Sequence, residues 1–108
     1  MSNIDFSQMI TAEAKAASAE AARKAAIDAA IQGRLNEVAQ GRGYTSADSL
    51  VSWALSNQVR FQEEAARFAL WRDEVWVMAV QMQEANAEIT AAEILGALPA
   101  IDWERPLI

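Results

Sequence analysis

Apolar residues recur at intervals of three and four along much of this chain, which is the spacing of one face of an α-helix. The first such stripe consists of Ile27, Ile31, Leu35 and Val38. A second, longer stripe begins at Phe61 and ends at Met82, and it passes through positions 65, 68, 71, 75 and 78. The two stripes predict a helix over residues 12–40 and a long helix over residues 58–87.

Alanine dominates the first half of the predicted helix over residues 12–40. Eleven of the nineteen residues from Ala12 to Ala30 are alanine, the residue with the highest helix propensity. Glycine at positions 41 and 43 is a stop signal for the end of this helix. Because an alanine face gains little from packing, we expect this half either to lie close against another helix or to project from the rest. An oligomerising coiled coil is an alternative, although the heptad pattern lasts less than two heptads.

Two shorter helices are predicted on either side of the long one. Thr45 or Ser46 suits the N-cap of a helix that ends near Asn57. Thr90 and Glu93 have the spacing of a capping box before another apolar run. Both signals are local, so they predict where these helices begin without any knowledge of the packing.

The fold class predicted by these patterns is all-α, either an elongated helical hairpin or a small bundle. Thirty helical residues extend about 45 Å, and two such helices do not fit a compact domain with a radius of gyration of about 13 Å. Pro99 ends the last helix, and we expect Trp103 in the extended tail to dock back onto the domain. We place a joint at residues 41–43, between a helical arm of residues 1–43 and an aromatic module of residues 44–108.

The long predicted helix has more apolar residues than one buried face can hold. Trp71 and Trp76 are five positions apart, so they point about 140° away from each other. This helix is therefore buried on two sides, or one tryptophan faces a partner chain. Our candidate interface residues are Trp71, Trp76, Met78, Met82, Trp103, Ile27 and Ile31. We expect a homo-oligomer, a complex with other proteins, or both.

Composition excludes several kinds of chemistry. The 108 residues include neither cysteine nor histidine, so thiolate metal sites, a cysteine nucleophile and the commonest general base are all missing. Fifteen acidic and nine basic residues give a net charge of −6, and all of it lies in residues 44–108. We therefore expect no enzymatic activity, no small-molecule substrate, no metal or other cofactor and no nucleic-acid partner.

The remaining motifs favour surface roles. Glu63 and Glu64 are neighbours, and neighbours in a helix point about 100° apart, so they do not form a shared site. Glu84 and Glu88 are one turn apart but have no further ligands beside them for a cation. The sequence at residues 41–43 is too short for a phosphate loop.

The chain has no pattern that predicts contact with a membrane. No stretch approaches the ~20 uninterrupted apolar residues of a membrane span. Residues 1–10 have no basic start of a secretory signal. The charges of the alanine helix balance, which disfavours a basic helix on a membrane surface. We expect no membrane partner.

Several motifs follow one another in a distinctive order between residues 34 and 106. They include a Gly-Tyr pair after a helix, a Phe-x-x-Glu segment, a Trp-Arg-Asp-x-Val-Trp core and a final Leu-Pro before a tryptophan. The residues that carry them are Gly43-Tyr44, Phe61 to Glu64, Phe68, Trp71-Arg72-Asp73, Val75-Trp76, Thr90 to Glu93, Leu98-Pro99 and Trp103. In this order they resemble the C-terminal region of small tail-associated and tail-fibre-associated proteins of tailed bacteriophages and prophages.

The resemblance covers about two thirds of the chain and leaves the alanine helix outside. The family usually has Asp where this chain has Thr45, and Glu104-Arg105 separate Trp103 from Pro106. It implies a structural component or assembly factor of the tail or tail-fibre region, located in the virion or the host cytoplasm, with other tail proteins as partners. It brings no catalytic residue. The alternative is an acidic binding module that regulates or inhibits a host protein.

Overall fold

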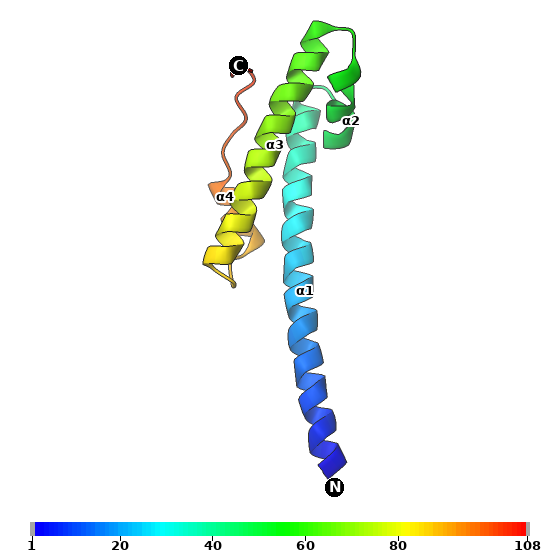
Figure 1. Cartoon of the computed structure of the whole chain (residues 1–108), viewed down its shortest axis with the longest axis vertical. Helices are drawn as coiled ribbons and strands as arrows, with labels where there is room; N and C mark the ends of the chain where they lie inside the picture. Colours follow the sequence, from blue (N-terminus) through cyan, green and yellow to red (C-terminus); the bar gives the residue numbers. More distant parts are fainter. Residues whose placement is uncertain (1, 108) are drawn as a thin grey trace.

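The computed structural model describes the backbone of residues 2–107 and the side chains of residues 11–107. All regular secondary structure in this part of the chain is helical (Figure 1). Its elements are α1 (Ser2–Gly41), α2 (Ala47–Ser52), the 3-10 turn η1 (Trp53–Leu55), α3 (Val59–Ala85) and α4 (Ala91–Ala97). The described residues include no strand. The molecule measures 72 × 24 × 21 Å, so the prediction of an elongated all-α fold is confirmed.

Helices α1 and α3 are the two long helices of the molecule, and the short helices α2 and α4 both pack against α1 (Figure 1). The buried apolar residues of the long helices, together with those of the shorter elements, make one hydrophobic core. The core residues from the two long helices are Ile27, Ile31, Leu35, Ala39, Ala65, Phe68, Trp71, Val75 and Ala79. Side chains from both sides of the joint at residues 41–43 therefore pack together, and the joint itself coincides with the end of α1.

Helix α1 has two halves with different surroundings. All side chains of residues 11–22 are exposed, whereas Ile27, Ile31 and Leu35 are buried and Val38 is half-buried. Between them, the guanidinium Nη1 of Arg23 donates a hydrogen bond to the carbonyl of Ile89, 3.1 Å away. Figure 1 shows the amino-terminal half extending alone beyond the body. Of the two arrangements expected for the alanine half, the structure has the projecting one.

The predicted starts of α2 and α4 agree with the observed caps, whereas α1 begins at Ser2, ten residues before the predicted start at residue 12. The side chain of Ser46 accepts a hydrogen bond from the backbone of Ser49 at the start of α2. Thr90 and Glu93 form both hydrogen bonds of a capping box at the start of α4. The long predicted helix over residues 58–87 corresponds to α3 within two residues at each end. Local capping chemistry therefore determines where α2 and α4 begin.

The tail after α4 packs along α3 (Figure 1). The indole nitrogen of Trp71 donates to the carbonyl of Pro99 at 2.9 Å. Trp103 stacks on Phe68, with 6.4 Å between ring centroids, and Arg105 forms an ion pair with Glu74. The expected docking of Trp103 is confirmed, and α3 packs against α2, η1 and the tail.

Candidate functional site at the junction of α1 and α2

The turn that ends α1 is a Schellman motif. The N–H of Tyr44 donates to the carbonyl of Ala39 at 3.0 Å, and the N–H of Gly43 donates to that of Gln40 at 3.0 Å. Gly43 has a φ of +100°, a conformation that glycine adopts without steric cost. The motif fixes the backbone on both sides of Gly43, so it positions Arg42 and Tyr44 next to α3.

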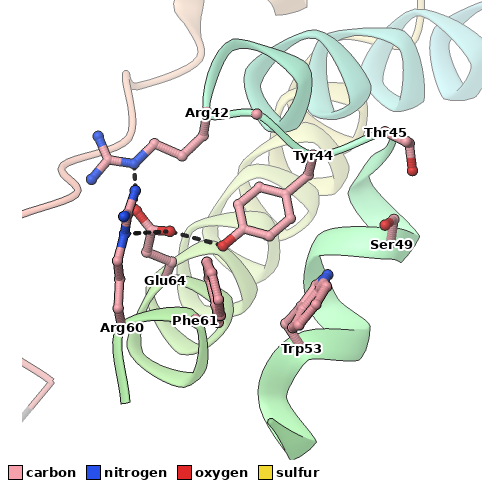
Figure 2. A pocket seen from close by; sticks show the side chains of 9 residues that line it. Arg42, Tyr44, Thr45, Ser49, Trp53, Arg60, Phe61 and Glu64 are labelled. Carbon is pink, nitrogen blue, oxygen red and sulfur yellow. Dashed lines mark hydrogen bonds and ion pairs between the residues drawn. The ribbon is translucent and has the colours of Figure 1, made fainter. Parts of the chain in front are cut away.

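These two side chains converge on Glu64, a carboxylate on the inner face of α3 that is only 4% exposed (Figure 2). The Nε of Arg42 donates to Oε2 of Glu64 at 2.5 Å, and the Tyr44 hydroxyl donates to Oε1 at 2.8 Å. The Nε of Arg60, one turn earlier in α3, lies 3.9 Å from Oε1. The buried charge is therefore compensated by two guanidinium groups and a phenol, as a buried carboxylate requires.

The cluster changes the acidity of two of its members. Burial raises the pKa of the Glu64 carboxyl, but the hydrogen bonds from Arg42 and Tyr44 lower it by more than burial raises it. The pKa of Glu64 therefore lies below its usual value. Burial, followed by the hydrogen bond to the Glu64 carboxylate, raises the pKa of Tyr44 to about 12. At neutral pH the cluster therefore contains one carboxylate, one neutral phenol and two cations, which leaves one net positive charge.

A hollow of about 480 Å³ opens beside this cluster (Figure 2). Trp53 and Phe61 form its aromatic wall, with 5.0 Å between their ring centroids. Trp53 is 41% exposed, a large value for a tryptophan. The guanidinium of Arg42 also lies over the ring of Trp103, 4.9 Å from the centroid. The hollow therefore combines exposed aromatic surface with two guanidinium groups.

These groups are suited to binding. Guanidinium groups donate hydrogen bonds to anions, and aromatic rings bury apolar or cationic groups. Within residues 11–107, no group of three or more carboxylates lies close enough together to hold a metal ion. We name the set formed by Arg42, Tyr44, Arg60, Glu64 and the aromatic wall the junction site.

A second apolar surface lies on the outer side of α3. Trp76, Val77, Val80 and Gln81 line a shallow hollow of about 380 Å³. Val77 and Val80 are both more than half exposed. An exposed apolar surface of this kind is typical of an interaction face.

The predicted interface residues separate into two groups in the structure. Ile27, Ile31 and Trp71 lie in the core of the single chain, where residues of the same chain cover them. Trp76, Met78, Met82 and Trp103 are half-buried. Of these four, Trp76 lines the outer hollow of α3 and Trp103 contacts Arg42 at the junction site. An interface role for these side chains stays a prediction.

Sequence reasoning missed the junction site. It treated Glu64 as one of two neighbouring acids without a shared site, and Arg42 as part of the joint at residues 41–43. A signal was present, because Glu64 lies one turn before Phe68 on the apolar stripe of α3. A carboxylate on an apolar stripe must find a partner. The stripe does not reveal that the partners come from the turn after α1.

Comparisons with models of protein families, with curated proteins and with solved structures found no match. Among the residues that the structure describes, no helix is both long and apolar enough to cross a membrane.

Proposed function

We propose that this chain is a non-enzymatic bacteriophage or prophage protein that acts through protein–protein contacts in the tail or tail-fibre region. Its role there is that of a structural component or an assembly factor. The chain works together with further copies of itself, with other tail proteins, or with both.

The observation that carries the proposal is the projecting half of α1. Residues 11–22 form three turns of helix with every side chain exposed. In proteins, most helical stability comes from packing of one face and not from propensity. A long projecting helix is therefore suited to binding another protein chain, which would supply the missing packing.

Two further observations support a role in protein contacts. The outer side of α3 exposes Val77 and Val80 next to the half-buried Trp76. The order of motifs from Gly43-Tyr44 to Trp103 resembles tail-associated phage proteins. The chain also has neither histidine nor cysteine, so the residue types most used in catalysis are absent from its sequence.

Sedimentation of the purified chain tests the contact function. We expect the full chain to form an oligomer at micromolar concentration and a variant without residues 1–22 to be monomeric. That variant keeps every described core residue, because the first of them is Ile27. A full chain that stays monomeric at high micromolar concentration would count against assembly through the projecting half.

The phage setting needs a separate test in infected cells. A virion component copurifies with intact particles, whereas an assembly factor is absent from them but binds an unassembled tail protein. If the chain instead binds a basic host protein, and salt weakens that binding, the alternative of an acidic inhibitor replaces the proposal.

A further inference from the structure

We infer that the junction site binds a short acidic segment of a partner protein, with one Asp or Glu carboxylate held by the two arginines and an adjacent apolar side chain held by the aromatic wall. This inference rests on the proposed contact function and names the chemistry of one partner surface. Its evidence is independent of the projecting half of α1.

The two arginines carry two positive charges, and the buried Glu64 carboxylate neutralises only one of them. Each contributes its Nε to the Glu64 carboxylate, at 2.5 Å for Arg42 and 3.9 Å for Arg60. The terminal amino groups of both form no hydrogen bond within residues 11–107. The side chains are 38% and 76% exposed, so these donors are open to solvent. The planar guanidinium of arginine can donate two parallel hydrogen bonds to one carboxylate, a geometry that the ammonium group of lysine does not offer.

The arginines are also held in place before any partner arrives. Arg42 is fixed by its bond to Glu64 and by its position over Trp103. Arg60 lies over the ring of Phe61, with 5.8 Å between its guanidinium carbon and the ring centroid. Ordering a long side chain on binding has an entropic cost, so an arginine that is already ordered loses less.

The aromatic wall defines the second half of the ligand. Trp53 is exposed on η1, and Figure 2 shows Phe61 between Trp53 and Glu64, with the Tyr44 ring above Phe61. Tryptophan, tyrosine and arginine are the residue types enriched where a few residues dominate the binding energy. A ligand that places an apolar side chain against Trp53 and a carboxylate at the arginines uses both halves of the hollow.

Charge selects a single carboxylate over a polyanion. The chain has a net charge of −6, and the junction site has only two of its nine basic residues. A nucleic acid requires neutralisation of several phosphates, which two arginines on an acidic chain do not supply. A peptide segment with one acid next to an apolar residue matches the local charge of the site.

Two synthetic peptides test the inference: acetyl-Gly-Leu-Glu-Gly-amide and the same peptide with Gln in place of Glu. The readout is the indole N–H signal of Trp53 in the NMR spectrum of the 15N-labelled full chain. The indole of Trp71, which is hydrogen-bonded to Pro99, is the internal reference. We expect the Glu peptide to saturate the Trp53 signal at a concentration about tenfold lower than the Gln peptide, because a charge-assisted hydrogen bond is worth roughly that factor.

The variant R60Q tests whether Arg60 binds the peptide carboxylate. Arg60 is exposed, so its replacement leaves the hydrogen bonds of Arg42 and Tyr44 to Glu64 intact. We expect R60Q to reduce the preference for the Glu peptide to less than about threefold. The matched control is K24Q, which removes one positive charge from an exposed site on α1 and should retain the full preference.

Four outcomes would overturn the inference. Equal saturation by both peptides, or no shift of Trp53 at millimolar peptide, would show that no carboxylate binds there. An undiminished preference in R60Q would show that Arg60 does not hold the peptide carboxylate, as the inference requires. Saturation by inorganic phosphate below the concentration of the Glu peptide would assign the site to a phosphorylated ligand. A monomeric chain that still prefers the Glu peptide would contradict only the assembly through α1.

Discussion

The two halves of α1 have the same backbone conformation and very different surroundings. Residues 11–22 are exposed on every side, whereas Ile27, Ile31 and Leu35 are almost completely buried against the rest of the chain. The difference lies in side-chain size, because the first half offers mostly methyl groups and the second half offers branched aliphatic side chains. Helix propensity therefore forms both halves, but only the second contributes to the core.

The largest expected effect comes from shortening a side chain in the buried half. Leu35→Ala should lower the free energy of unfolding by about 2–5 kcal/mol, because Leu35 is fully buried and the change leaves a cavity. Urea denaturation measures this effect. The matched control is Ala19→Gly in the exposed half, which should change global stability by less than about 0.5 kcal/mol. Similar losses for both variants would contradict the division of α1.

The junction site should give the next largest effect. Arg42→Met should lower the free energy of unfolding by about 2–3 kcal/mol, because Glu64 then remains buried without its closest cation. Arg60 remains 3.9 Å away and limits the loss. Arg60→Met is the control and should cost less than about 1 kcal/mol, because the Arg60 side chain is exposed. Equal costs would show that Arg42 does not hold the carboxylate.

Acid should weaken the fold partly through Glu64. Its pKa is lower in the folded chain than in the unfolded one, so it contributes stability above its unfolded pKa of about 4.5. That contribution is lost as the pH falls through the lower, folded pKa. Glu64→Gln should therefore be less stable than the natural chain at pH 7, and the difference should shrink as the pH is lowered below about 4.5. Unfolding curves at several pH values measure it, and a constant difference would contradict it.

The smallest effect is expected from removal of the exposed half. Deletion of residues 1–22 should change the free energy of unfolding by less than about 0.5 kcal/mol at dilute concentration, where assembly does not add to stability. Hydrogen exchange of the full chain gives a parallel measurement. Amides of residues 11–22 should exchange much faster than those of residues 27–39, because an exposed helix frays more easily than a packed one. Equal protection along α1 in the dilute chain would contradict this picture.

Most of the secondary structure could be predicted because its causes are local. The apolar intervals of three and four predicted α3 and the buried half of α1, but not the start of α1 at Ser2, and the capping pair Thr90 and Glu93 predicted the start of α4. Glycine after α1 predicted the end of that helix, which the Schellman motif at Gly43 explains. Each of these signals acts within a few residues, so it can be read without the packing.

The sequence by itself determined where the helices lie, apart from the start of α1 at Ser2, and that the alanine half of α1 has little to bury. Only the tertiary structure decided that this half projects, that the tail packs on α3, and that Arg42 and Tyr44 meet Glu64. Those two contacts join residues 22 and 20 positions apart. Helix periodicity specifies a face but not the element that covers it, so such pairs form only when α1 and α3 pack together.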